Sequence, residues 1–362
     1  MALAPDSPLY AINLGAIEDA ASRIAGAVHV TPVLTCSSIT EMAGKAEVFL
    51  KVEALQKSGS FKARGACNAV FSLGADEAKA GVVTHSSGNH AQAVAVAAQL
   101  RGVPAHIVMP SDAPSVKKQA VLGYGATVTQ CEPTGEAREA AAKEVQAATG
   151  ATFIHPSNDP RVMAGQGTMA LELLQQIPSE RCRLASQAAT LAATLEALGA
   201  PAKGTIPPRG AGDPIVDAVI VPVGGGGMLS GVAVALASLD PRIRIFAAEP
   251  AGAADAAASV AAGELLGHET PPKTIADGLR TTLGSNTWPI VRDFVEAVIV
   301  VSEEAIADAT QLVWSRCKIA IEPSAGVGVA ALLSEEFRAL QGIDSVAVVL
   351  CGGNAGVPNL AS

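Results

Sequence analysis

The chain has 362 residues, of which 49% are hydrophobic and 16% are charged, so it is long enough to bury a large core and to form two domains. Its formal net charge of −9 argues against nucleic acid or an anionic membrane surface as a standing partner. The sequence has no apolar run of the roughly 18 residues that a membrane-spanning helix needs. Six cysteines without C-x-x-C pairing and an N-terminal region without a signal pattern lead us to expect a cytoplasmic protein.

Strand-like and helix-like segments alternate along the chain, which predicts an α/β fold whose parallel sheets carry helices on both faces. The strand candidates are residues 48–52, 81–84, 105–109, 126–130, 216–221, 243–248 and 346–350. Helices are expected to follow Lys62, Asn89, Pro114, Gly135, Met163 and Gly227. The four short units between Gly81 and about His155 are expected to form a sheet of their own. Residues 179–214 predict a helix followed by a Pro/Gly-rich surface loop, inserted before a core strand.

Lys62 lies in the segment Ser60-Phe61-Lys62-Ala63-Arg64-Gly65, where an aromatic ring and glycines supply an apolar wall. A lysine amine condenses with a cofactor aldehyde only when it is unprotonated, so it must be desolvated or lie near positive charge. A lone lysine beside glycines is usually a solvated loop residue. The interpretation of Lys62 therefore depends on the rest of the chain.

A run of four glycines, Gly224, Gly225, Gly226 and Gly227, stands between an apolar strand and a helix that begins with Met228. At the start of a helix, backbone N–H groups converge on one spot and bind phosphate. A flexible linker has a similar composition, but it would not be flanked by a buried strand and an amphipathic helix. Together with Lys62, this glycine loop indicates a phosphate-bearing cofactor that is anchored by a lysine.

Four stretches together resemble the fold-type II pyridoxal phosphate family of serine racemases and serine/threonine dehydratases. They are Ser60-Phe61-Lys62-Ala63-Arg64-Gly65, Ser86-Ser87-Gly88-Asn89-His90, Gly224-Gly225-Gly226-Gly227-Met228 and Cys351-Gly352-Gly353-Asn354, in the family's order and rough spacing. The resemblance extends over nearly the whole chain except residues 179–214. It implies two three-layer αβα domains with parallel sheets, like those of tryptophan synthase β. Residues 1–77 and 157–362 would form the large cofactor domain, and residues 78–156 a small mobile domain.

The resemblance also assigns residues to the cofactor. It implies that Lys62 binds pyridoxal 5′-phosphate covalently, that Asn89 hydrogen-bonds its phenolic oxygen, and that Cys351 meets its ring nitrogen. The implied cofactor site is completed by Phe61, Gly224, Gly225, Gly226, Gly227, Met228 and Gly278. Serine is commoner than cysteine at the position of Cys351, and neither group holds a proton on the pyridine as a carboxylate would. This departure leaves the ratio of racemisation to dehydration open.

Residues 86–90 follow a strand and open a helix, a place where backbone N–H groups bind anions, although an ordinary serine N-cap is the alternative. Racemisation needs acid/base groups on both faces of the cofactor plane, and the resemblance implies Ser87 as the partner of Lys62. Dedicated dehydratases of the family usually carry alanine at that position. The implied substrate-binding residues are Ser86, Ser87, Gly88, His90 and Arg138. For Arg138, a solvated ion pair on its own helix is the alternative.

Glu249, Ala253 and Asp255 follow the strand candidate 243–248 and match the metal site of the family residue by residue. Two carboxylates and a backbone carbonyl in a tight turn suit Mg²⁺ or Ca²⁺, whereas an acidic turn without a metal is the alternative. The resemblance further implies a homodimer and ATP as an activator. The positions that match nucleotide contacts are Lys57, Gln92, Lys117, Tyr124 and Lys318.

The resemblance implies an enzyme that interconverts L- and D-serine and also eliminates water from serine to give pyruvate and ammonia. The nearest alternative is a threo-3-hydroxyaspartate or serine/threonine ammonia-lyase. Gly225-x-Gly227-x-x-Ser230 with Glu249 is also a degenerate dinucleotide fingerprint, so an NAD-binding oxidoreductase is a remote alternative. That alternative leaves Lys62 and Cys351 without a role. A non-catalytic binding protein, the third class, would be expected to have lost Lys62.

Overall fold

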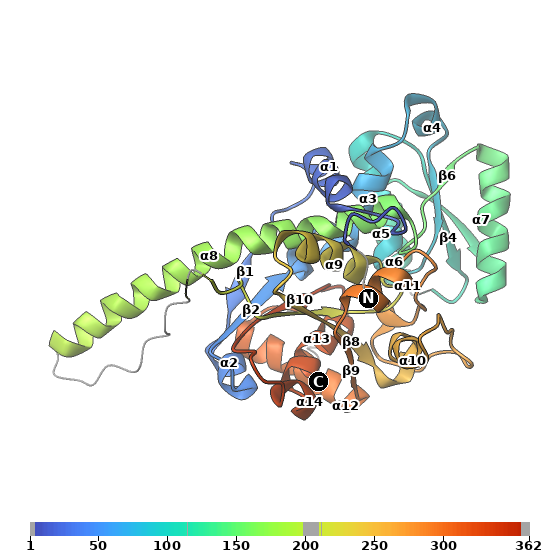
Figure 1. Ribbon diagram of the computed structural model, residues 1–362. Helices are drawn as coiled ribbons and strands as arrows, with labels where there is room; N and C mark the ends of the chain where they lie inside the picture. The colour runs from blue at the N-terminus through green and yellow to red at the C-terminus, as the bar shows by residue number, and fades with distance from the viewer. Residues whose placement is uncertain (1–3, 114, 198–209, 211, 356–362) are drawn as a thin grey trace, which may run out of the picture.

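Two separate sheets organise the molecule, and helices cover both faces of each (Figure 1). The computed structural model describes residues 4–113, 115–197, 210 and 212–355. None of the helices in this part of the chain combines the length and the apolar character that crossing a membrane requires. The predicted α/β architecture with layered sheets and helices is confirmed.

The larger sheet takes its strands from both ends of the chain. Within the described residues it contains, in spatial order, β1 (Val33–Thr35), β2 (Glu47–Val52), β10 (Ser345–Leu350), β7 (Ala218–Pro222), β8 (Arg244–Pro250) and β9 (Ala297–Val301). Neighbouring strands are parallel except β1 and β2, which pair antiparallel. The predicted parallel arrangement is confirmed for the other strand pairs, and β1, which was not among the strand candidates, adds an antiparallel edge. The connection from β1 to β2 is shorter than the roughly dozen residues that a parallel crossover needs.

Helices lie on both faces of the larger sheet, which explains its nearly continuous apolar strands. One face carries α1 (Leu14–Ile24), α8 (Pro160–Ala197), α9 (Gly227–Leu239) and α11 (Trp288–Phe294), and the other carries α2 (Ser37–Ala43), α12 (Glu303–Leu312), α13 (Pro323–Leu333) and α14 (Glu335–Arg338) (Figure 1). Helix α10 (Asp255–Ala262) lies beside β9. Every residue of β7 and of β10 is buried. The loops that follow these two strands are therefore held on a rigid support.

The smaller sheet is built from one continuous part of the chain. Its parallel strands, in spatial order and within the described residues, are β5 (Thr127–Cys131), β4 (Ala105–Pro110), β3 (Val82–His85) and β6 (Thr152–Phe153). The helices around it are α3 (Lys62–Phe71), α4 (Ala75–Ala80), α5 (Asn89–Arg101), α6 (Ser115–Gly123) and α7 (Gly135–Thr149). Helix α5 lies between this sheet and α3, and α7 covers the outer face (Figure 1). The predicted separate sheet is confirmed, whereas the domain boundaries and the mobility of residues 78–156 remain predictions.

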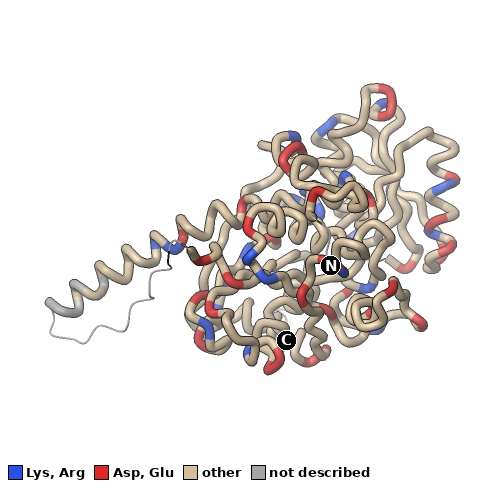
Figure 2. The backbone as a smooth tube through the Cα atoms, viewed as in Figure 1, with Lys and Arg blue, Asp and Glu red and all other residues tan. Residues whose placement is uncertain are grey.

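Helix α8 differs from the sequence-based expectation. The helix predicted after Met163 and the helix predicted from residue 179 are one helix, which passes through Pro178. The prediction of a separate inserted helix is therefore wrong. Two charge-assisted hydrogen bonds from Arg181 to Glu47 of β2, at 2.7 and 2.6 Å, anchor α8 beyond the proline. The last part of α8 projects from the body of the molecule (Figure 2), and residues 198–209 and 211 of the expected loop lie outside the described residues.

Candidate active site

Lys62 is held in place by the loop that follows β10. The Phe61 N–H donates to the carbonyl oxygen of Cys351 at 3.0 Å, and Ser60 forms an antiparallel bridge with Gly352. Lys62 Nζ donates to the carbonyl oxygen of Pro156 at 2.7 Å and lies 5.0 Å from the centroid of the Phe61 ring. Two segments from opposite ends of the chain thus place this amine.

The surroundings of Lys62 favour its uncharged form. Burial lowers the pKa of Lys62 to about 8, although its interactions with Cys351 and Glu322 act in the opposite direction. Burial also raises the pKa of the Cys351 thiol well above its ordinary value, so this thiol stays protonated near neutral pH. The unprotonated form, which a reactive amine requires, is therefore about a hundredfold or more commoner at pH 7 than it would be with the ordinary lysine pKa of 10.5.

The glycine loop, Gly224–Gly227, could not be built from larger residues. A Cβ atom at Gly225 would lie 2.3 Å from Ser157 Oγ, and one at Gly227 would lie 2.7 Å from the Ser157 carbonyl oxygen. Gly226 has a φ of +79°, which side chains rarely adopt. The loop opens α9, where the first N–H groups have no partner within the helix. This is the geometry of an anion-binding loop.

The glycine loop and Lys62 line one cavity. Its other walls come from Phe61, Ser157, Pro222, Met228, Leu229, Gly278, Leu279 and Thr281. Gly278 is close-packed as well, because its N–H donates to Ser324 Oγ at 3.0 Å and a Cβ there would lie 2.9 Å from the same oxygen. The predicted cofactor residues Phe61, Met228 and Gly278 thus meet at this cavity. Ser157 and Thr281 were missed by the sequence analysis because they lie in loops without a recognisable motif.

Glu322 is a further group beside Lys62, and the sequence analysis gave it no role. This buried carboxylate accepts a hydrogen bond from Asn89 Nδ2 at 2.7 Å, and Asn89 Oδ1 accepts one from Asn354 Nδ2 at 2.8 Å. Burial raises the pKa of Glu322 to about 7, and the nearby Asp277 adds to this effect. Its place just before a helix-opening proline was the available signal. The contact of Asn89 with a phenolic oxygen remains a prediction.

The loop of residues 86–90 connects β3 to α5. Ser86 Oγ accepts a hydrogen bond from the Gly88 N–H at 3.3 Å, and Ser87 is half-buried. Among the described residues Lys62 Nζ donates to the Pro156 carbonyl oxygen, and no hydrogen bond joins it to Ser87. The position of Ser87 opposite Lys62 across a cofactor therefore remains a prediction.

His90, the last residue of this loop, is buried. Its Nε2 lies 3.1 Å from the Ile154 carbonyl oxygen, which makes Nε2 the protonated nitrogen of a neutral ring. Burial lowers the pKa of His90 to about 3, and the charge of Lys62 acts in the same direction. Nδ1 is buried, and in the part of the chain that the structure describes it has no hydrogen-bond partner. We therefore regard His90 as a neutral support of the loop, and its contact with a substrate remains a prediction.

Arg138 and the residues expected to contact a nucleotide are spread over several segments. Arg138 Nε donates to the Thr134 carbonyl oxygen of its own helix at 3.2 Å. Lys117 of α6 pairs with Asp277 at 2.7 Å and so connects the two sheets. The remaining positions are Lys57 at the start of a short 3-10 helix, buried Gln92 in α5, half-buried Tyr124 after α6 and Lys318 after α12. The roles of these residues remain predictions.

Glu249 and Asp255 lie around the end of β8, and both are buried. The two Glu249 oxygens accept the N–H groups of Ala256 and Ala257 at 2.9 Å, and Asp255 Oδ2 accepts the Leu283 N–H at 2.8 Å. Burial raises the pKa of Glu249 to about 8 and also raises that of Asp255. A nearby positive charge would lower both pKa values and so favour the ionised carboxylates.

The described residues contain no group of three or more His, Cys, Asp or Glu side chains placed to hold a metal ion. The predicted metal site has only two side-chain ligands and one backbone carbonyl, that of Ala253. Asp255 Oδ1 is buried and forms no hydrogen bond with any described residue, although His268 Nε2 lies 3.3 Å away. An oxygen in this position fits a cation that is completed by water.

Comparison with known proteins decides the family. Residues 24–352 match the family described as pyridoxal-phosphate dependent enzyme. The chain belongs to this family. The lysine, the glycine loop and the cavity between them fit the cofactor: Lys62 has a lowered pKa, and the loop leaves no room for side chains at Gly225 and Gly227. The fold expectation and the pyridoxal phosphate expectation are confirmed.

Members with similar sequences and structures cover almost the whole chain. Serine racemase of Dictyostelium discoideum is 45% identical, with 98% of each chain covered. The structure of maize serine racemase has a TM-score of 0.85 at 43% identity and covers 96% of this chain and 95% of its own. The T.th. threonine deaminase has a TM-score of 0.80 at 40% identity, covering 96% of this chain and 99% of its own.

Proposed function

We propose that the protein interconverts L- and D-serine and, as a side reaction, converts serine to pyruvate and ammonia. The observation that carries this proposal is the buried amine of Lys62, which shares a cavity with the glycine loop. The similarity to serine racemases and to a threonine deaminase over nearly the whole chain supports the racemase and the elimination activity respectively.

Bound pyridoxal phosphate withdraws electrons from the substrate Cα and so acidifies the Cα proton. The N–H groups of the glycine loop would bind its phosphate, while Asn89 and Cys351 would meet its ring. Lys62 Nζ would take the Cα proton on one face, and Ser87 Oγ would exchange a proton on the other face. Ser86 and the amide of Gly88 would bind the substrate carboxylate, and Arg138 would turn toward the substrate when residues 78–156 move.

An ammonia-lyase acting on serine, threonine or threo-3-hydroxyaspartate is the second candidate. Cys351 favours it, because a buried, neutral thiol does not hold a proton on the cofactor ring as a carboxylate would. A ring without that proton accepts electrons less well, so departure of the substrate hydroxyl competes with return of the proton to Cα.

Chiral product analysis separates the two candidates. The purified enzyme is incubated with L-serine, L-threonine or threo-3-hydroxyaspartate, and both D-amino acid and keto acid are measured. We expect D-serine and pyruvate from L-serine. Fast ammonia release from threo-3-hydroxyaspartate without any D-serine from L-serine would instead make the protein an ammonia-lyase.

We also propose a Mg²⁺ or Ca²⁺ ion at Glu249, the Ala253 carbonyl oxygen and Asp255. Binding of a cation would give a partner to Asp255 Oδ1, which forms no hydrogen bond, and would tie the start of α10 to β8. We expect a chelator to lower the thermal stability and added Mg²⁺ to restore it. The control variant is Asp76→Ala, because Asp76 is exposed on α4. If Asp255→Ala responds to chelator and to Mg²⁺ in the same way as Asp76→Ala, the metal site is misplaced.

The remaining proposals concern assembly and activation. We propose a homodimer in the cytoplasm that ATP activates through Lys57, Gln92, Lys117, Tyr124 and Lys318. All six cysteines are free thiols, which supports a reducing compartment. The ion pair between Lys117 and Asp277 joins the part of the chain around the smaller sheet to the large domain. A nucleotide that bound Lys117 would break this ion pair and so would change how the two parts are held together.

A further inference from the structure

A buried threonine lies directly behind the glycine loop. Thr287 stands just before α11 and is fully buried. A Cβ atom at Gly226 would lie 2.7 Å from Thr287 Oγ1, so the loop and the threonine are in close contact. Thr287 itself does not line the cavity that contains Lys62. It therefore supports the glycine loop from the side that faces away from the cavity.

The hydroxyl of Thr287 donates its proton to the glycine loop. Its Oγ1 accepts the Gly284 N–H at 2.8 Å and lies 3.1 Å from two carbonyl oxygens, those of Gly284 and Gly225. The Gly284 oxygen already accepts the N–H groups of Thr287 and Trp288, at 3.1 and 2.9 Å, which occupy its two lone pairs. Among the described residues, the Gly225 oxygen has no donor other than this hydroxyl. We therefore assign the single hydroxyl proton to the hydrogen bond with Gly225.

This hydrogen bond orients the peptide between Gly225 and Gly226. In a planar trans peptide the carbonyl oxygen and the N–H point in opposite directions. Because the Gly225 oxygen points to Thr287, behind the loop, the Gly226 N–H points to the side of the cavity. This N–H is buried and donates to no acceptor in the described part of the chain. A buried N–H of this kind needs an acceptor, and an anion in the cavity would supply one.

The turn that carries Thr287 is fixed by contacts on either side. The Leu283 N–H donates to Asp255 Oδ2 at 2.8 Å. The Asn286 N–H donates to Asn158 Oδ1 at 2.8 Å, and Asn286 Nδ2 donates to the Asn158 carbonyl oxygen at 2.9 Å. The hydroxyl of Thr287 therefore has a set position before any ligand binds.

We propose that Thr287 is a positioning residue for the cofactor, whose hydroxyl aims the Gly226 N–H at the phosphate. The proposal rests on the proposed binding of the phosphate by the glycine loop and is independent of the proposed reaction. A donor that is oriented in advance does not have to be turned when the ligand binds. Loss of the hydroxyl should therefore weaken recognition of the phosphate and leave the rest of the cofactor site unchanged.

The test compares pyridoxal phosphate with pyridoxal, which lacks the phosphate. Cofactor-free protein is titrated with each compound, and the change in absorption gives the two affinities and their ratio. Thr287→Val replaces the hydroxyl by a methyl group of similar size. We expect its affinity for pyridoxal phosphate to fall about tenfold, while its affinity for pyridoxal stays within about twofold of the wild type.

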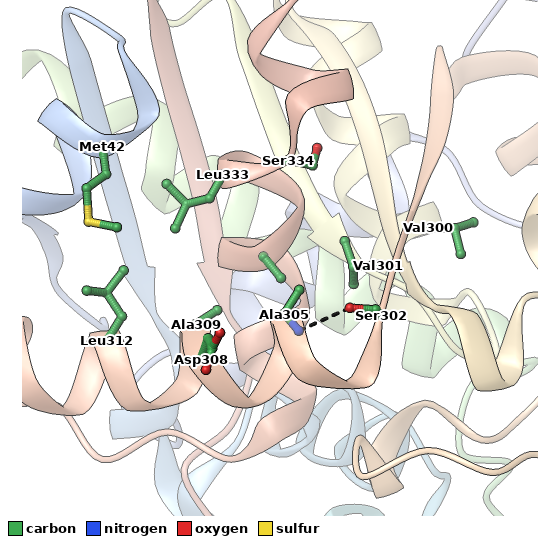
Figure 3. A pocket seen from close by; sticks show the side chains of 11 residues that line it. Met42, Val300, Val301, Ser302, Ala305, Asp308, Ala309, Leu312, Leu333 and Ser334 are labelled. Carbon is green, nitrogen blue, oxygen red and sulfur yellow. Dashed lines mark hydrogen bonds between the residues drawn. The ribbon is translucent and has the colours of Figure 1, made fainter.

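Thr287→Ser keeps the hydroxyl and loses the methyl group, so it should show the affinity ratio of the wild type. This expectation tests the proposal even if the valine variant does not fold. The control is Ser334→Ala, because Ser334 Oγ also accepts one N–H, from Phe337 at 3.1 Å, and donates to one carbonyl oxygen, that of Ala331 at 2.8 Å. Ser334 lies with Met42 and Leu333 at a groove that shares no lining residue with the cavity of Lys62 (Figure 3). Its loss should lower stability without changing the affinity ratio.

An unchanged ratio in Thr287→Val would overturn the proposal, whether both affinities stay the same or both fall, since the threonine would then support only the fold. A ratio in Thr287→Ser as low as that in Thr287→Val would overturn it as well. If the wild type bound the two compounds equally, the proposed binding of the phosphate by the glycine loop would itself be wrong.

Discussion

The two sides of the candidate active site are built differently. On the side of the larger sheet, backbone contacts hold Lys62 and the glycine loop. The Phe61 N–H donates a hydrogen bond to the Cys351 carbonyl oxygen, and the glycine loop packs directly on Ser157. On the side of the smaller sheet, the described residues show no hydrogen bond from Ser87 or Arg138 to the part of the site that the larger sheet carries. Side-chain hydrogen bonds, from Asn89 to Glu322 and from Lys117 to Asp277, connect the two sides.

This difference separates cofactor binding from the choice of reaction. Backbone contacts keep the cofactor side in place before anything binds, so damage there should affect every activity. In the proposed function the other side would supply the groups that select a face of the substrate, so damage there should affect one reaction more than another. The predictions below test this division.

Lys62→Ala should have the largest effect, because within the described part of the chain no other amine shares the cavity with the glycine loop. We expect loss of both racemisation and elimination, and loss of the absorption band of the lysine-bound cofactor. The measurement is a spectrum of the purified variant together with the two rates. Retained racemisation with an unchanged spectrum would defeat the assignment of Lys62.

Gly225→Ala should weaken cofactor binding by about tenfold or more, because a Cβ there would lie 2.3 Å from Ser157 Oγ and displace the loop. Titration of the cofactor-free variant with pyridoxal phosphate measures the affinity. Gly267→Ala is the control, since a Cβ at that exposed glycine meets no atom within 4 Å. Equal affinities of the two variants would show that the loop does not bind the cofactor.

Glu322→Gln should change how stability depends on pH. Burial raises the pKa of Glu322 from 4.5 to about 7, so between these values the folded state keeps a proton that the unfolded state has lost. The free energy of unfolding of the wild type should therefore fall as pH rises through this window, by on the order of 3 kcal/mol relative to the variant.

Chemical denaturation of the cofactor-free proteins at pH 4.5 and pH 8 gives this difference. The variant keeps an acceptor for Asn89 Nδ2, so a change in packing should be small. Parallel pH profiles for the two proteins would mean that Glu322 titrates normally in the folded state.

Sequence patterns predicted those parts of the molecule that depend on local order. The glycine loop follows β7 and opens α9 as expected, and buried strands such as β10 stand out as apolar runs. Strand β1 escaped prediction because three residues carry no pattern, and its antiparallel pairing depends on β2. The continuity of α8 through Pro178 depends on a contact between Arg181 and Glu47 that only the fold creates.

The same distinction applies to the site. Lys62 lies in a motif that can be read in the sequence, whereas Ser157 reaches the cavity only because the glycine loop packs on it. Glu322 stands just before the proline that opens α13, but its burial and its hydrogen bond with Asn89 appear only when distant segments meet. Residues whose role comes from tertiary contact thus left little or no signal in the sequence.

The central claim is that Lys62 and Ser87 act on opposite faces of the substrate. The most direct test measures D-serine formation and pyruvate formation from L-serine for the wild type and Ser87→Ala under one set of conditions. We predict that racemisation falls by at least about a hundredfold, while elimination from L-serine survives and elimination from D-serine collapses. Equal loss of both activities from L-serine would contradict the account, because Ser87 would then serve substrate binding rather than proton transfer.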